Sequence, residues 1–155
     1  MSQKWIQEFR EFVALLHRHE VRYLLVGGYA VGWHGYPRVT KDINFFVEPS
    51  AENAARLTAV LDDFGLGSLG IKEDDLLREE SCIFFGRPPS RIELINFATG
   101  ITFDEAWATK IEANRDGEPL LVIGREMLLK NKRATARLQD LADVGILERR
   151  PPPKP

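Results

Sequence analysis

Residues 22–48 read RYLLVGGYAVGWHGYPRVTKDINFFVE, and this stretch decides the expected fold. A first apolar run ends at Gly27 and Gly28, a short helix-compatible segment follows, and a second apolar run begins at Asp42. Short apolar runs that are bounded by glycine or a polar residue are typical of buried strands. The stretch therefore predicts a strand over 22–26, a helix over about 28–35 and a strand over 42–48.

The second predicted strand carries two side chains that suit a nucleotide with bound metal. Asp42 and Asn44 are two residues apart, so on a strand both point to the same face. Two glycines at the end of the preceding strand let a phosphate approach the backbone closely. Asn44 supplies an oxygen ligand but lacks the negative charge of a carboxylate. The pattern thus predicts a site for a magnesium-bound triphosphate, in which the metal has one charged and one neutral oxygen ligand.

This arrangement resembles the nucleotidyltransferase superfamily. Its signature is Gly-Gly or Gly-Ser, a spacer and Asp-x-Asp, with a third acidic residue on a later strand. Here the pair is Gly27-Gly28, the spacer is residues 29–41 and the acidic motif reads Asp42-Ile43-Asn44. Glu93, within the apolar run RIELINF, stands where the family usually has Asp.

The end of the chain adds to the resemblance. Residues 128–148 are similar to the closing helices of small bacterial nucleotidyltransferases and their toxin–antitoxin relatives. The resemblance implies an α/β (α+β) fold in which a mixed β-sheet is flanked by helices. We expect a single nucleotidyltransferase-like domain over 1–148 and a proline-rich, disordered tail over 149–155.

The resemblance also implies a reaction and its ligands. A nucleoside monophosphate would pass from a nucleoside triphosphate to an acceptor hydroxyl, with two Mg²⁺ ions held by the catalytic residues Asp42, Asn44 and Glu93. The nucleotide would contact the backbone at Gly27 and Gly28, where a helix begins. Further nucleotide contacts are expected from basic side chains, namely Arg38, Lys41, Lys130, Lys132 and Arg133.

Asn44 leaves the activity open between several hypotheses. The chain could be an active enzyme that tolerates the neutral ligand, or one that an Asp-to-Asn change has inactivated. It could instead be a non-catalytic, antitoxin-like protein that binds a nucleotide or a partner. Because an amide facing two dications loses a favourable charge interaction, we favour an enzyme-family protein of reduced or blocked activity.

A basic stretch over 125–137 supports a third hypothesis, an RNA-binding module without chemistry. This stretch holds five basic residues against the single acid Glu126. A solvated helix face and a cationic wall for phosphates or RNA both explain such a run. The whole chain has a net charge of −2, which gives it no general attraction to nucleic acid.

Composition fits one small domain. A chain of 155 residues with 44% hydrophobic content can bury one compact core. No apolar run approaches the roughly 20 residues that span a bilayer, and the first segment lacks a secretory apolar region. We therefore expect a cytoplasmic protein without membrane contact. The only cysteine, Cys82, lies in an apolar run and is expected in the core.

The remaining pattern predicts further elements and leaves the acceptor open. Helices are expected over 3–18, after a Ser50 cap, after a Thr102–Glu105 capping box, and over 124–133 and 138–148; strands are expected over 81–85, 91–97 and 119–123. The acceptor could be RNA, a protein or a small molecule. Because a short chain has little room for an acceptor domain, a homo-oligomer or a toxin–antitoxin partner could complete the site.

Overall fold

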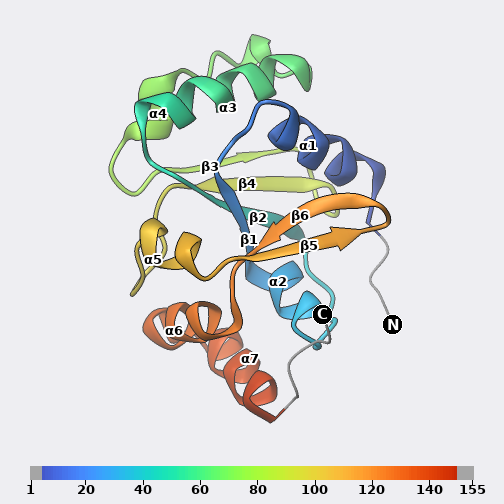
Figure 1. Ribbon diagram of the computed structural model, residues 1–155, viewed down its shortest axis with the longest axis vertical. Helices are drawn as coiled ribbons and strands as arrows, with labels where there is room; N and C mark the ends of the chain where they lie inside the picture. Colours follow the sequence, from blue (N-terminus) through green and yellow to red (C-terminus); the bar gives the residue numbers. More distant parts are fainter. Residues whose placement is uncertain (1–4, 150–155) are drawn as a thin grey trace.

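The computed structural model describes residues 5–149, which form a six-stranded sheet with helices packed around it (Figure 1). In spatial order the strands are β3 (Cys82–Phe85), β4 (Arg91–Ile95), β2 (Asp42–Val47), β1 (Tyr23–Val26), β6 (Glu118–Val122) and β5 (Ile111–Arg115). β2 and β4 are parallel, as are β1 and β6, whereas the other neighbouring pairs are antiparallel. The sheet is therefore mixed, which confirms the predicted fold class.

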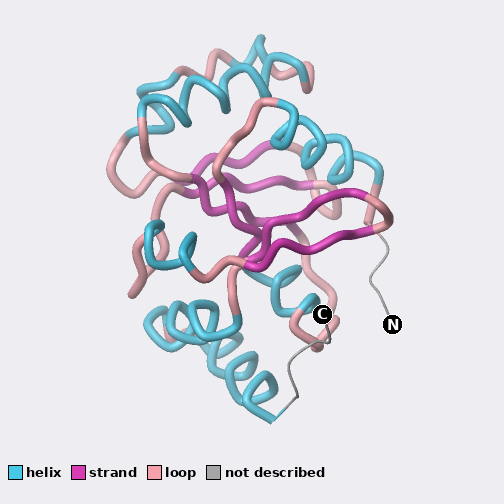
Figure 2. Tube along the Cα trace, viewed as in Figure 1, coloured by secondary structure: helices cyan, strands magenta, loops and turns pink. Residues whose placement is uncertain are grey.

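The helices gather in two groups (Figures 1 and 2). On one side of the sheet lie α1 (Gln7–Arg18), α3 (Ala51–Asp63) and α4 (Glu73–Leu77). Toward the opposite side lie α2 (Gly27–Trp33), α5 (Phe103–Ala108), α6 (Arg125–Thr135) and α7 (Leu138–Arg149). A short 3₁₀ helix, Gly67–Leu69, follows α3.

Packing of α1 decides which face of β2 carries the site. The apolar stripe of this helix is buried, and the ring of Phe12 lies 5.6 Å from that of Phe45 on β2. Burial of such apolar surface is the main force that fixes the helix on the sheet. Because side chains alternate along a strand, Phe45 on the α1 side leaves Asp42 and Asn44 on the opposite face. That face looks toward α6 and α7.

Most predicted elements are present, and the structure adds elements that were not predicted. Ser50 caps α3 through its side chain, and Thr102 and Glu105 form the predicted capping box of α5. The strand β5 was not predicted; it pairs with β6 through a turn at Asp116 and Gly117. The short helix α4 was not predicted either, and its Leu76 is buried.

The limits of the described range leave the predicted tail open. Residues 1–4 and most of the predicted tail over 149–155 lie outside the described residues, so the division at residue 148 stays a prediction. Between residues 5 and 149, every helix is too short or too polar to cross a membrane.

Candidate functional site

A cleft of about 780 Å³ lies between the sheet, the start of α2 and the α6–α7 junction. It brings together the glycine pair and the three residues predicted as catalytic: Gly27, Gly28, Asp42, Asn44 and Glu93. Arg38 and Lys132 also line it. The predicted contacts Lys41, Lys130 and Arg133 are not part of the lining found within residues 5–149.

Strand pairing explains why distant residues meet here. In the parallel pair of β2 and β4, Asp42 lies opposite Arg91 and Asn44 lies opposite Glu93. Paired positions on neighbouring strands place their side chains on the same face. The four side chains therefore form two adjacent rows on the floor of the cleft.

Both carboxylates on this floor already have partners from the chain itself. Arg91 donates from Nη2 to Oδ2 of Asp42 at 3.0 Å. Asn44 donates from Nδ2 to Oε1 of Glu93, and the thiol of Cys82 on β3 donates to Oε2 of Glu93 at 2.9 Å. The negative charge of each carboxylate is thus stabilised by donors of the protein.

The amide of Asn44 is oriented by these neighbours. An amide presents its NH₂ group to a carboxylate, because two oxygens in contact repel one another. The amide oxygen therefore turns away from Glu93 and lies over Gly27, where an added Cβ would collide with it. Gly27 also has a positive φ of 70°, a conformation that glycine adopts without strain. Glycine is required here for both reasons.

The residues present do not form a ready site for magnesium. A magnesium site needs several hard oxygens converging on one point. Here the oxygen of Asn44 faces away from Glu93, and Asp42 is bound to a guanidinium. Within the described chain, no group of three or more His, Cys, Asp or Glu side chains could hold a metal ion. The two-ion site predicted from the resemblance stays a prediction.

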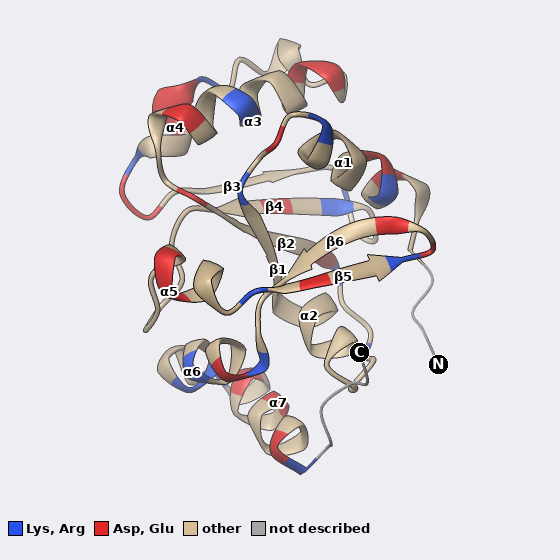
Figure 3. Cartoon of the chain, in the orientation of Figure 1, with Lys and Arg blue, Asp and Glu red and all other residues tan. Residues whose placement is uncertain are grey.

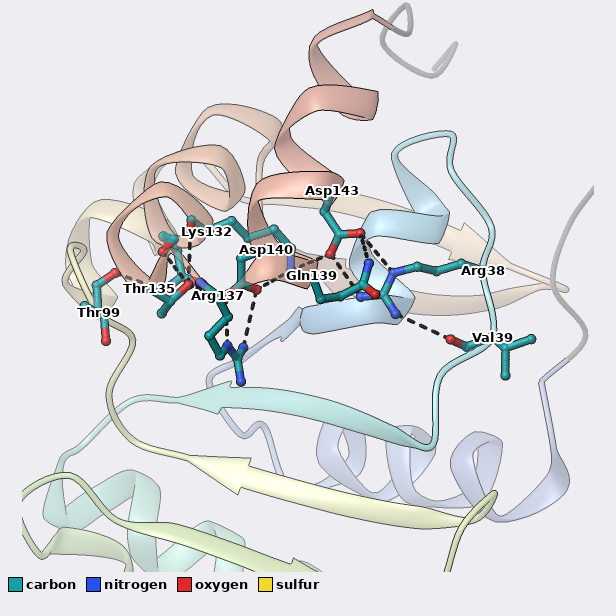
Figure 4. A network of polar contacts seen from close by, with 10 residues as sticks. Arg38, Val39, Thr99, Lys132, Thr135, Arg137, Gln139, Asp140 and Asp143 are labelled. Atoms are coloured by element: carbon teal, nitrogen blue, oxygen red, sulfur yellow. Dashed lines mark hydrogen bonds and ion pairs between the residues drawn. The ribbon is translucent and has the colours of Figure 1, made fainter.

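The wall of the cleft opposite the sheet is a network of ion pairs from α6, α7 and the loop before β2 (Figure 4). Arg38 donates to both carboxylate oxygens of Asp143 at 3.0 Å each. Lys132 lies between Asp140 and Asp143, with Nζ 3.2 Å and 3.0 Å from their oxygens. The side chains of Lys132, Asp140 and Asp143 are all buried. Lys132 is therefore a structural cation, and the solvated-face interpretation of this residue is wrong.

Contacts in this network shift the acidity of its carboxylates. Burial by itself would raise the pKa of Asp140, but hydrogen bonds from Arg137 and Thr135 and the charge of Lys132 outweigh burial and lower that pKa to about 2. The same competition between burial and the bonds from Arg38 and Lys132 lowers the pKa of Asp143. Both groups stay ionised in neutral solution.

The basic stretch over 125–137 is cationic in sequence, but in the fold acidic side chains pair with its basic residues. Its basic side chains each have an acidic partner, and Figure 3 shows acidic and basic residues intermixed over α6 and α7. The pairs are Arg125–Glu126, Lys130–Glu105, Lys132 with Asp140 and Asp143, Arg133–Glu148 and Arg137–Asp140. Such pairing weakens the case for an RNA-binding surface.

Sequence reasoning missed two residues of the site, Arg91 and Arg137. Arg91 precedes Glu93 by two positions, so the alternation of a strand could have placed it on the same face as Glu93, although only the register of β2 and β4 sets it beside Asp42. Arg137 follows α6 and lines the cleft, where the carboxylate of Glu93 helps raise the pKa of its guanidinium, after the larger effect of Asp140. Only the fold brings Arg137 and Glu93 together.

The expected core position of Cys82 is wrong. Cys82 is exposed and lines the cleft. Partial burial, the hydrogen bond to Glu93 and the charge of that residue raise the pKa of the thiol to about 12. The thiol therefore stays protonated and acts as a donor to Glu93.

The sequence matches no protein-family model and no curated protein. Solved structures, in contrast, share the architecture over most of the chain. The antibiotic-resistance factor ANT(2'')-Ia superposes with a TM-score of 0.59 and 12% identity over 90% of this chain and 80% of its own. The lincosamide antibiotic adenylyltransferase LnuA, in its lincomycin-bound form, gives a TM-score of 0.57 and 14% identity over 95% of this chain and 98% of its own.

A third similar structure comes from Thermotoga maritima and is described as a nucleotidyltransferase. It gives a TM-score of 0.54 with 12% identity, covering 91% of this chain and 88% of its own. The chain has the nucleotidyltransferase fold. The nucleotidyltransferase fold places the glycine pair, Asp42, Asn44 and Glu93 of this chain around one cleft. The predicted family resemblance is therefore confirmed at the level of the fold.

Proposed function

We propose that this protein binds a nucleoside triphosphate in the cleft and that its native residues support nucleotidyl transfer only poorly. The nucleotidyltransferase fold and the size of the cleft favour a nucleotide as the ligand. The observation that supports poor transfer is the hydrogen bond from Asn44 to Glu93. It holds the neutral amide of Asn44 in the position from which a second carboxylate would act.

The transfer reaction makes clear demands on these side chains. The acceptor oxygen forms a bond to the α-phosphorus, the bond from that phosphorus to the bridging oxygen breaks, and pyrophosphate leaves. The acceptor hydroxyl must also lose its proton to a base. Glu93 accepts two hydrogen bonds and Asp42 is paired with Arg91, so donors of the chain itself already engage oxygens of both candidate bases.

A metal-dependent transferase is the second candidate. Asp42, Asn44 and Glu93 lie on one face beside the glycine pair, as the resemblance implies for the residues that hold two magnesium ions. For this candidate Arg91 must leave Asp42 and the Asn44 amide must rotate when the nucleotide enters. An ion there would supply charge stabilisation to the leaving and attacking oxygens.

The acceptor is proposed only by class. LnuA is an adenylyltransferase of a lincosamide antibiotic, so a small molecule with a hydroxyl group is one acceptor class to test. RNA and protein acceptors, a toxin–antitoxin partner and a homo-oligomer remain predictions of the sequence. The neutralised basic stretch makes RNA the least favoured of these acceptors.

Incubation with labelled nucleoside triphosphates in cell lysate tests the proposal. Wild type should label acceptors slowly, and Asn44→Asp should label them at least about tenfold faster, equivalent to about 1.4 kcal/mol of barrier. The control Asn131→Asp makes the same chemical change elsewhere in the cleft and should give no gain. Rapid labelling by wild type, with no gain in Asn44→Asp, would contradict impaired transfer. No labelling by either protein would favour a non-catalytic nucleotide- or partner-binding role.

A further inference from the structure

Arg91 occupies a fixed position beside Asp42. Its strand pairing with β2 sets the two residues opposite each other, and its guanidinium bonds to Asp42 at 3.0 Å. On its other side, the guanidinium carbon lies 4.9 Å from the centre of the Phe84 ring, a cation–π contact. Two strands therefore hold the positive charge of Arg91 at the floor of the cleft.

The guanidinium supplies what a bound cation would supply at this point. Arginine side chains in proteins carry a permanent positive charge, so the cation beside Asp42 does not depend on a bound ion. A divalent cation at Asp42 would be repelled by this charge or would have to displace it. Asn44 and the Cys82 thiol stabilise Glu93 in the same way, with donors in place of an ion.

The electrostatic balance of the whole cleft points in the same direction. Its lining contains four cationic side chains, Arg38, Arg91, Lys132 and Arg137, against three carboxylates, Asp42, Glu93 and Asp140, and the buried Asp143 behind Arg38 and Lys132 makes the two charges equal. A strongly anionic triphosphate thus enters a cleft that has no excess of negative charge. A counter-ion is needed when carboxylates outnumber the cations of a site, and here they do not.

Arg91 also has donor capacity left for a ligand. Its Nε–H is buried and has no hydrogen-bond partner within residues 5–149. A buried donor without a partner is costly, and because the Arg91 side chain as a whole is 35% exposed, a rotation of the guanidinium toward the cleft would present this donor to a phosphate oxygen. Planar guanidinium groups bind phosphate through two or more such bonds.

We infer that Arg91 acts as a built-in counter-cation for Asp42 and as a phosphate ligand, so that the cleft binds nucleoside triphosphates without magnesium. This inference rests on the proposed nucleotide-binding function. The inference also predicts which form of the nucleotide binds better. Arginine side chains attract the negative charge of the phosphates, and magnesium neutralises part of that charge. The free triphosphate should bind at least as tightly as its magnesium complex.

Titration of wild type with ATP by calorimetry, in excess EDTA and in excess magnesium, tests the inference directly. The expected result is a dissociation constant in EDTA equal to or lower than that in magnesium. A loss of affinity of about tenfold or more in EDTA, equivalent to about 1.4 kcal/mol, would overturn the inference. Failure to bind under both conditions would refute the proposed function itself.

Substitution of Arg91 provides an independent test. Arg91→Met keeps an extended side chain over Phe84 but removes the charge, so affinity for ATP in EDTA should fall at least about tenfold. The control Arg133→Met removes a charge from an exposed pair outside the cleft lining and should leave affinity unchanged. Equal affinity in Arg91→Met and wild type, both in EDTA, would overturn the role of Arg91.

The double variant Asn44→Asp with Arg91→Met reverses the arrangement. It gives Asp42, position 44 and Glu93 a carboxylate each and removes the cation between the strands. Magnesium should then increase ATP affinity, whereas in wild type it should not. Circular dichroism of each variant establishes that the fold is retained. A double variant that is folded yet indifferent to magnesium would contradict the counter-cation role.

Discussion

Replacement of Asp143 by Asn should destabilise the protein strongly, because it removes one charge from a buried network. The Asp143 side chain is fully buried and contacts both Lys132 and Arg38. In the variant, Lys132 keeps a single carboxylate partner, Asp140. Arg38 loses the carboxylate that accepts its two hydrogen bonds.

The expected size of the effect follows from the burial of the partners. Removing one member of a buried ion pair typically costs about 3–5 kcal/mol. Asp140 still compensates Lys132, and the amide of Asn retains some hydrogen bonding, so the lower end, about 3 kcal/mol, applies here. For a chain of this length, about 1 kcal/mol corresponds to about 2–4 °C in melting temperature, which gives a loss of about 6–12 °C.

Thermal unfolding followed by circular dichroism measures this loss. Glu148→Gln is the matched control, since it removes a carboxylate from the Arg133 pair, in which both side chains are about half exposed. Exposed pairs contribute about 1 kcal/mol or less, so the control should shift the melting temperature by at most a few degrees. If Asp143→Asn melts within about 2 °C of the control, the network does not stabilise the fold as argued.

Two further predictions concern the same wall of the cleft. The pKa values of Asp140 and Asp143 are lowered in the folded state, so their stabilisation is present above the unfolded pKa of about 3.9 and is lost as pH falls toward about 2. The free energy of unfolding, measured with urea at each pH across this range, should fall more steeply with decreasing pH in wild type than in Asp143→Asn. Equal slopes in the two proteins would exclude the network as the cause. Arg133→Ala should change stability by less than about 1 kcal/mol and leave ATP affinity unaltered in calorimetry, whereas a large loss of affinity would restore Arg133 to the site.

Local sequence signals predicted the framework of the site. The glycine pair, the apolar run after Asp42 and the apolar run around Glu93 predicted the strands that carry the central residues. Alternation along β2 correctly placed Asp42 and Asn44 on one face, both lining the cleft. These features depend on residues that are close in sequence, so the local sequence pattern is enough to predict them.

Contacts between distant segments could not be predicted in this way. Lys132 appears in a basic run, yet the fold buries it between two carboxylates of the following helix. Arg91 meets Asp42 only through the register of β2 and β4, which periodicity does not specify. The strand β5 escaped prediction because its residues IEANR are only partly buried at the edge of the sheet.

Amide NMR spectra recorded during addition of ATP test the central claim, that this cleft binds a nucleoside triphosphate. The account predicts saturable shifts of the backbone amides of Gly27 and Gly28 and of the side-chain amide of Asn44, all of which line the cleft. Amides of α3, on the other side of the sheet, should stay unmoved (Figure 1). Unchanged cleft resonances at saturating ATP, or shifts confined to residues outside the cleft, would contradict the account.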